Sequence, residues 1–189
     1  MSDPVEILDY WLGSIGPEGW FAGGEDLDAE IRALFLATWT SARDGGLEHW
    51  AEGAVGTLAY LILTDQMSRN IHRDTALAFA ADPLAHAAAY RAVALNWDMQ
   101  IDGAARQFFY MPFMHAETMA DQNRSVACFA KRMADSDNLL HARAHRQVIR
   151  RYGRFPTRNA ALGRAGTAGE QAYLDQGGYG ALVRALKQG

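Results

Sequence analysis

The chain has 189 residues, with 18 Lys and Arg against 22 Asp and Glu and a formal net charge of −4. A chain of this length buries roughly 70% of its unfolded surface, enough for one sizeable core. The mild acidity argues against nucleic acid or an anionic membrane as a general partner, because both favour basic surfaces. The single cysteine, Cys128, excludes an intramolecular disulfide and multi-cysteine zinc sites, and is typical of a reducing compartment.

The N-terminus lacks the pattern of a secretory signal, because no positive segment precedes a long apolar one. The most apolar run, residues 54–64, is about half the ~20 residues that a membrane-spanning helix needs. We therefore expect a cytoplasmic protein with no membrane partner.

The first half of the chain predicts four helices. Asp3 and Pro4 are a typical cap and first turn, and the glycines between residues 13 and 19 are expected to end that helix. Apolar residues spaced by three and four predict further helices over 28–43 and 58–70. A fourth, capped by Asp74 or Thr75, is expected to reach Leu95 and to restart or kink near position 82–83.

The second half continues in the same way. Residues 102–110 predict a short helix, and Pro112 is expected to begin one longer helix that reaches about Met133. Residues 137–151 predict another helix, and 152–164 an ordered loop with one short turn. Thr167 and Glu170 form a capping-box pattern ahead of a final pair of short helices.

No segment alternates polar and β-branched residues as a strand does, so the fold class is expected to be all-α. The chain also shows no linker, low-complexity tract or fixed-period repeat. Residues 1–189 are therefore expected to form a single all-α domain.

A first polar cluster follows the apolar run at residues 58–64. Asp65, Arg69 and Arg73 are spaced to share one helix face, and Gln66 and Asn70 form a neighbouring row. This pattern fits a ligand site, and it equally fits a helix end whose charges pair locally or face water.

A second polar cluster sets aromatic residues beside ionisable ones, a chemistry that can shift pKa values. On one continuous helix, His115 and Gln122 would share a face, and Glu117 would lie one turn from Asp121. The cluster fits acid/base catalysis or a buried polar network, but its spacing matches no established metal motif, and we expect no metal and no cofactor. Its members are Arg106, Tyr110, His115, Glu117, Asp121 and Gln122.

Two further groups lie towards the C-terminus. His141 and His145 are one helical turn apart, but the arginines around them at 143, 146, 150 and 151 would repel a metal cation, so we expect a packing or surface role. In the following loop, Arg154, Arg158 and Asn159 could clamp an anion or could hold the loop to acidic side chains.

Together these segments resemble the bacterial "domain of unknown function 924" family over nearly the whole chain. The resemblance implies a tetratricopeptide-like α/α superhelix, in which stacked antiparallel helices leave a concave surface. No activity comes with the family, so no catalytic residue is carried over. The segments that carry the resemblance are Trp20–Phe21, Leu63–Asn70, Arg73, Ala78–Leu84, Phe108–Glu117, Asp121–Gln122 and Gly153–Arg164.

Three functional hypotheses stay open. The favoured one is a binding module whose groove of Arg, His and Asp side chains takes a small anionic ligand or a peptide, with homodimerisation left open. The alternative is a hydrolase or lyase in which His115 works with Glu117, Asp121 or Asp65. The third is a buried salt-bridge network without ligand. The residues predicted to bind a ligand are Asp65, Gln66, Arg69, Asn70, Arg73, Arg106, Tyr110, His115, Gln122, Arg154, Arg158 and Asn159.

Overall fold

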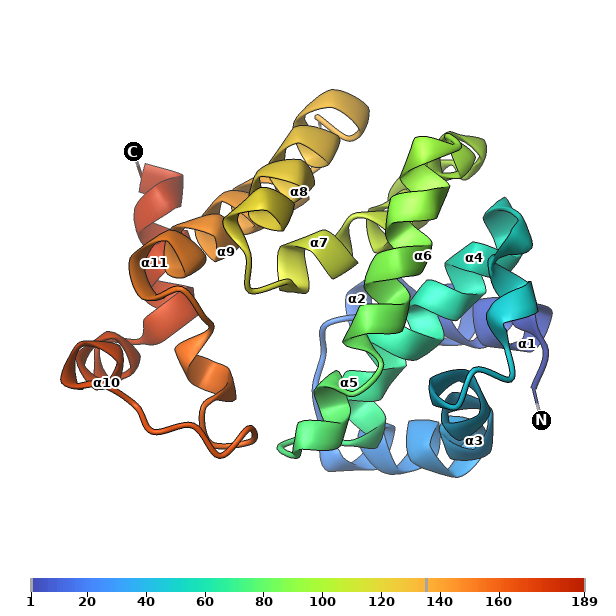
Figure 1. The fold of residues 1–189 in the computed structure, drawn as a ribbon, viewed down its shortest axis with the longest axis horizontal. Coiled ribbons are helices and arrows are strands. Elements are labelled where there is room, and N and C mark those ends of the chain that lie inside the picture. The colour runs from blue at the N-terminus through green and yellow to red at the C-terminus, as the bar shows by residue number, and fades with distance from the viewer. Residues whose placement is uncertain (1, 135, 189) are drawn as a thin grey trace. The chain divides into compact units, whose positions relative to one another are not determined.

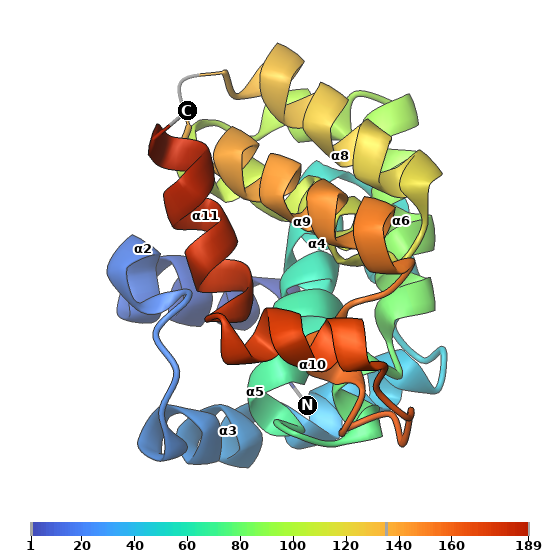
Figure 2. The same ribbon diagram turned by 90° about the vertical axis from the view of Figure 1, so that its left-hand side faces the viewer.

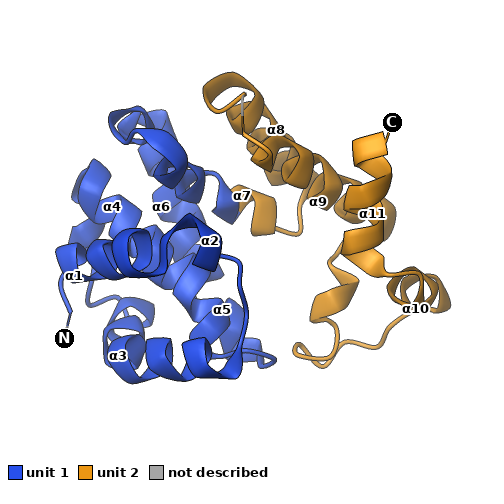
Figure 3. Cartoon of the chain, turned by 180° about the vertical axis from the view of Figure 1, so that it is seen from behind, with its two compact units in different colours: residues 1–112 blue, residues 113–189 orange. Residues whose placement is uncertain are grey.

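A computed structural model of the chain describes residues 2–134 and 136–188, and every regular element in these ranges is helical (Figure 1). The predicted all-α class is therefore confirmed. The chain divides into two compact units, Met1–Pro112 and Phe113–Gly189 (Figure 3), and each is described by itself. The single domain and the tetratricopeptide-like superhelix stay predictions.

The first unit begins with the predicted cap. The Asp3 carboxylate accepts from the backbone N–H groups of Val5 and Glu6, and the Glu6 carboxylate accepts from the Asp3 backbone N–H at 3.1 Å. Of the glycines expected to end this helix, Gly13 lies inside the π-helical segment (Asp9–Ile15) that continues α1 (Pro4–Leu8). Gly16, with a φ of 67°, ends that segment as predicted, and the short α2 (Gly16–Gly19) follows.

The centre of the first unit is a helical run that starts four residues earlier than the sequence predicts. It comprises α4 (Ala54–Leu61), a π-helical segment (Ile62–Met67) and α5 (Ser68–Ile71). Glycine is required at position 56, because a Cβ there would collide with the Trp50 carbonyl oxygen. The run packs against α3 (Glu25–Arg43) and α6 (Asp82–Ala94), and α6 starts afresh at Asp82–Pro83 instead of continuing an earlier helix through a kink.

Short 3-10 helices complete this unit, at Glu48–Glu52, Ala76–Phe79, Trp97–Gln100 and Gly103–Phe109. Its core is rich in large aromatic side chains that pack edge to face. The Phe108 ring lies 6.4 Å from that of Trp11 and 5.0 Å from that of Trp20, and all three side chains are buried.

The second unit is built on a helical hairpin. In this unit α8 (Met119–Arg132) packs against α9 (Asn138–Tyr152), and α11 (Gly178–Gln188) also packs against α9 (Figure 2). The loop after α9 contains a 3-10 turn, Pro156–Arg158, and a further turn over residues 159–163, where the sequence predicted one short turn. The Thr167 capping box opens α10 (Ala168–Asp175), as predicted. Val148 and Ile149 of α9 form a small core with Phe155, and side chains of α10 and α11 pack against it.

The single helix predicted from Pro112 to Met133 is wrong, because it breaks between α7 (Met111–His115) and α8. Thr118 ends the connection by capping α8, its hydroxyl accepting from the Asp121 backbone N–H. The Gln122 side-chain amide donates to the carbonyls of Met114 at 2.7 Å and Ala116 at 2.8 Å, the groups that the break would otherwise leave unpaired.

None of the helices in the described ranges combines the length and the apolar character needed to cross a membrane.

Candidate functional site

The predicted residues at the end of the central run lie together and are bonded to one another. The buried Asp65 carboxylate accepts from the Gln66 side-chain amide at 2.5 Å and from the Arg69 guanidinium at 3.4 Å. Arg69 also donates to the Asp82 carboxylate at 2.7 Å and to the Ala78 carbonyl. This arginine therefore ties the central run to the start of α6.

Asn70 and Arg73 converge on one acidic residue that sequence analysis did not single out. Asp28, buried on α3, accepts from the Asn70 side-chain amide at 2.8 Å and from two nitrogens of Arg73. The Arg73 hydrogen bonds lower the pKa of the Asp28 carboxyl, although burial opposes that shift. The two predicted residues thus fasten α3 to the end of the central run.

Arg106 and Tyr110 meet at a buried aspartate. The Tyr110 hydroxyl donates to the Asp98 carboxylate at 2.5 Å, and Arg106 Nε donates to the carbonyls of Asp98 and Ile101 at 3.2 and 2.8 Å. These contacts join the 3-10 helix Trp97–Gln100 to the 3-10 helix Gly103–Phe109 and its C-terminal end.

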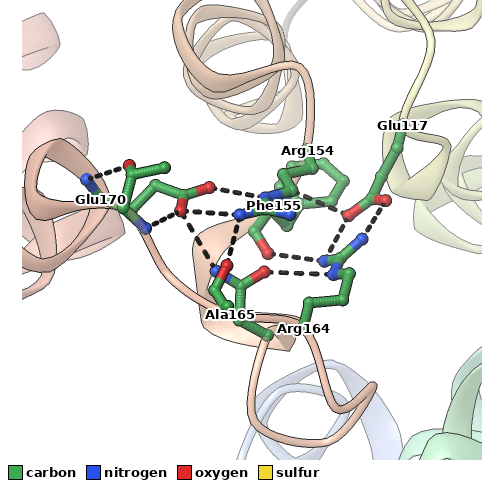
Figure 4. Close-up of polar contacts among 8 residues, drawn as sticks. Glu117, Arg154, Phe155, Arg164, Ala165 and Glu170 are labelled. Atoms are coloured by element: carbon green, nitrogen blue, oxygen red, sulfur yellow. Dashed lines mark hydrogen bonds and ion pairs between the residues drawn. The ribbon is translucent and has the colours of Figure 1, made fainter.

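In the second unit, Glu117 lies in the connection between α7 and α8 and joins it to the loop after α9 (Figure 4). Its carboxylate accepts from both terminal nitrogens of Arg164, at 2.7 and 3.0 Å, and from the Phe155 backbone N–H at 2.8 Å. Burial raises the pKa of Glu117, but the bonds from Arg164 and Phe155 outweigh it, and the pKa is lowered overall. Glu117 is therefore an anion engaged in structure at neutral pH.

A second carboxylate anchors the same loop. Glu170, nearly fully buried, accepts from Arg154 at 2.6 and 2.9 Å and from the Thr167 backbone N–H at 2.7 Å (Figure 4). Hydrogen bonding from Arg154, followed by that from Thr167, lowers the pKa of Glu170 to about 2. The Asn159 amide donates to the same carboxylate at 3.4 Å, and Arg158 lies over the Phe155 ring.

His115, at the C-terminal end of α7, is half-buried, and its ring lies 6.2 Å from that of His145 on α9. Because the His141 carbonyl can only accept, the bond between it and His145 Nδ1 at 2.9 Å places the proton on that nitrogen. Burial, followed by the charge of His115, lowers the pKa of His145 to about 3, so His145 is neutral near pH 7. His141 Nδ1 lies 2.6 Å from the Tyr179 hydroxyl. The predicted packing role of His141 and His145 agrees with these contacts.

The helix break also changes the geometry that sequence analysis assumed for catalysis. Glu117 precedes α8 and so does not share a helix face with Asp121, and Gln122 does not follow His115 on a continuous helix. The Asp121 carboxylate accepts from the Thr118 hydroxyl at 2.6 Å, within the cap of α8.

An open hollow of about 540 Å³ is lined by side chains of α9 and by one residue of α11. Arg151 stands over the Tyr152 ring, and Arg146 donates to Asn123 at 3.5 Å. None of the four arginines around the hollow forms an ion pair within residues 2–134 and 136–188. We call this hollow the arginine groove; it is lined by Arg143, Arg146, Gln147, Arg150, Arg151 and Leu186.

The predicted ligand-binding residues do not include the arginine groove. The signal was present in the sequence, because α9 has four arginines and no acidic residue. In the sequence, their positive charge argued only against a metal at His141 and His145, and no anion site was assigned to it. Only the arrangement of α9 and α11 shows that these side chains surround a common hollow.

Across the described residues, no group of three or more His, Cys, Asp and Glu side chains is placed to hold a metal ion.

Comparison with known proteins gives a family without an assigned activity. A family profile described as "Bacterial protein of unknown function (DUF924)" matches residues 7–178. A solved structure of a protein of unknown function from Agrobacterium tumefaciens is similar, with 36% sequence identity and a TM-score of 0.86. The match covers 92% of this chain and 97% of that one. No curated protein matches the chain.

Proposed function

We propose, for a chain that belongs to the DUF924 family of bacterial proteins of unknown function, that it is a binding module for anionic ligands. The arginine groove is the proposed binding surface. The observation that carries this proposal is a set of four arginines around one hollow, none of them in an ion pair within the described residues. Guanidinium groups of this kind bind carboxylates and phosphates through paired hydrogen bonds.

The arginines predicted from the motifs are less available. Arg69, Arg73 and Arg154 each hold a carboxylate through one or two hydrogen bonds, so a ligand would have to displace that partner first. Such pairs support the hypothesis of a structural network for these residues. A ligand-binding role for them stays a prediction.

The positive charge of the second unit also supports the arginine groove as an anion-binding surface. The second unit has 12 Lys and Arg against six Asp and Glu, a formal charge of +6 in a chain whose net charge is −4. Unpaired like charges on one helix repel each other, and an anion between them relieves that repulsion. A ligand with several negative charges therefore gains more than a single ion.

The length of the groove also favours a ligand with several negative charges. Arg143 and Arg150 are seven residues apart on α9, which corresponds to roughly 10 Å along the helix axis. A single phosphate or carboxylate reaches one pair of neighbouring arginines only. An acidic peptide or another extended polyanion could contact the whole row.

The hydrolase hypothesis centred on His115 is ranked below binding. The Glu117 carboxylate is engaged with Arg164 and Phe155, and the low pKa of His145 makes that neighbour a poor base near pH 7. Neither feature favours acid/base chemistry at this place.

Isothermal titration of the full chain with inorganic phosphate and with a hexaglutamate peptide tests the proposal. The double variant Arg143→Gln/Arg150→Gln is expected to weaken hexaglutamate binding by roughly tenfold or more, since charge-assisted hydrogen bonds are lost. The affinity of the wild type is expected to fall as salt rises, because the groove is solvent-exposed.

The matched control is Lys131→Gln/Arg91→Gln, which removes the same charge from exposed positions outside the groove. It is expected to change the affinity less than twofold. Equal weakening in both double variants, or no binding of either anion by the wild type at low salt, would contradict the proposal.

A further inference from the structure

A second hollow adjoins the arginine groove and shares Gln147 and Arg151 with it. It has a volume of about 180 Å³ and is bounded by α9, α10 and the first turns of α11. We call it the tyrosine pocket; it is lined by Gln147, Val148, Arg151, Tyr152, Tyr173, Gln176, Gly178, Ala181 and Leu182.

The tyrosine pocket has an apolar wall beside its polar lining residues Gln147, Arg151 and Gln176. Val148 belongs to the small core of the second unit, and Tyr152, Tyr173 and Leu182 pack against that core. The rings of Tyr152 and Tyr173 are 5.2 Å apart and tilted by 44°. An engineered cavity of roughly 150 Å³ holds benzene, so this pocket has the size for one aromatic ring.

One polar atom in this wall has no partner. The Tyr152 hydroxyl is buried and makes no hydrogen bond within the described residues. Buried hydroxyls nearly always have a partner, and an orphan beside a pocket indicates a place where a bound molecule or water completes the bonding.

Because the tyrosine pocket adjoins the arginine groove, we infer that the ligand of the second unit is an acidic peptide with an aromatic side chain beside its acidic residues. The acidic residues lie along the arginine groove and the aromatic ring enters the tyrosine pocket. This inference rests on the proposed function, because it takes the arginine groove as the anion site.

The geometry of an extended peptide fits this division. Side chains two residues apart point to the same side and are roughly 7 Å apart, close to the distance between arginines one turn apart on α9. Leu186 lines the groove, whereas Gly178, Ala181 and Leu182 line the pocket, so α11 runs from the pocket towards the groove. A peptide that follows the row of arginines towards the end of α9 therefore arrives at the pocket with its next side chain.

Fluorescence anisotropy with two labelled peptides tests the inference. One is Glu-Gly-Glu-Gly-Phe with an amidated C-terminus, and the other has Ala in place of Phe. The wild type is expected to bind the Phe peptide roughly tenfold more tightly, from the burial of one aromatic side chain. This comparison uses the unaltered protein, so it does not depend on whether a variant folds.

Filling the pocket provides the second test. Ala181→Phe is expected to reduce the affinity for the Phe peptide to that for the Ala peptide, and to leave binding of the Ala peptide unchanged. Ala172→Phe, at an exposed position on α10, is the control and is expected to change neither affinity.

The outcomes separate the two proposals. Equal affinity of the wild type for both peptides would overturn the pocket inference and leave anion binding in place. Failure of both peptides to bind would overturn the proposed function as well. Displacement of the labelled peptide by ATP at a lower concentration than by unlabelled peptide would assign the pocket to a nucleotide and refute the peptide.

Discussion

The two units of the chain use charge in opposite ways. The first has six Lys and Arg against 16 Asp and Glu, a formal charge of −10, whereas the second carries +6. In the first unit, Arg69 joins the central run to Asp82 at the start of α6, and Arg73 joins it to the buried Asp28 on α3. In the second, Arg154 and Arg164 also donate to carboxylates, whereas the arginines of α9 form no ion pair within the described residues.

The cores differ in parallel. The first unit contains all five tryptophans, whereas the largest buried side chains of the second are the phenylalanines Phe113, Phe129 and Phe155. Aromatic burial stabilises the first unit, and hydrogen-bonded carboxylates organise the loop of the second. The difference teaches that motif arginines such as Arg69, Arg73 and Arg154 hold carboxylates, whereas the four arginines of α9 form no ion pair within the described residues.

The largest expected effect is on the aromatic core of the first unit. Phe108→Ala removes a buried ring between two tryptophans and should lower the free energy of unfolding by about 3–5 kcal/mol. Urea denaturation followed by tryptophan fluorescence measures it, since every tryptophan lies in this unit. The exposed Phe21→Ala is the control, with less than about 0.5 kcal/mol expected. Similar losses for both variants would refute the aromatic core.

The next effect concerns the break between α7 and α8 in the second unit. Gln122→Ala leaves the carbonyls of Met114 and Ala116 without their side-chain donor and should cost about 2 kcal/mol. Thermal unfolding by circular dichroism measures the loss. The exposed neighbour variant Asn123→Ala should cost less than about 0.5 kcal/mol. A neutral Gln122→Ala would contradict the bonding described for this break.

A pH-dependent effect on stability is expected at His145 of the second unit. The pKa of His145 is lowered from its usual value near 6.5 to about 3, so below pH 6.5 the unfolded chain binds a proton that the folded chain does not. Stability should therefore fall as pH falls from 6.5 towards 3, by on the order of 1–2 kcal/mol between pH 6.5 and 5.

Urea denaturation between pH 7 and 5 measures this dependence. His145→Gln should remove the part of the change in unfolding free energy with pH that His145 contributes. His49→Gln, at an exposed site in the first unit, should leave this pH dependence unchanged. Identical slopes in the wild type and in His145→Gln would rule out the buried neutral imidazole.

A further pH-dependent effect is expected at the Glu170 anchor. Because the folded pKa is lowered to about 2, its contribution is complete above the usual carboxyl pKa near 4.5 and is lost as pH falls from there to about 2. Glu170→Gln should thus lower the thermal midpoint at pH 6, and the difference from wild type should shrink by pH 2.5. A difference that stays constant with pH would exclude the ion pair with Arg154 as its cause.

Much of the architecture follows from local signals. The Asp3 cap and the Thr167 capping box depend on neighbouring residues only and were predicted correctly, and the start of α6 at Asp82–Pro83 is one of the two alternatives that the sequence left open. The break after His115 was missed because the carbonyl acceptors of Gln122 are six to nine residues away in the chain. Apolar spacing predicts a helix but does not show where a side chain from the next one will end it.

The candidate site was harder to predict for the same reason. Asp28, 45 residues before Arg73, and Arg164, 47 residues after Glu117, are distant partners that no spacing rule connects. The sequence contains enough arginines and carboxylates to neutralise one another, but it does not show which of them form pairs.

By itself, the sequence determined the all-α class, the positions of most helix starts and the family, because these depend on periodicity, on caps and on motifs read along the chain. The tertiary structure alone decided which arginines hold carboxylates and which surround the arginine groove. Charge pairing is a matter of distances of a few ångströms between residues far apart in the chain, and only the packing of α9 against α11 brings the remaining cations to one surface.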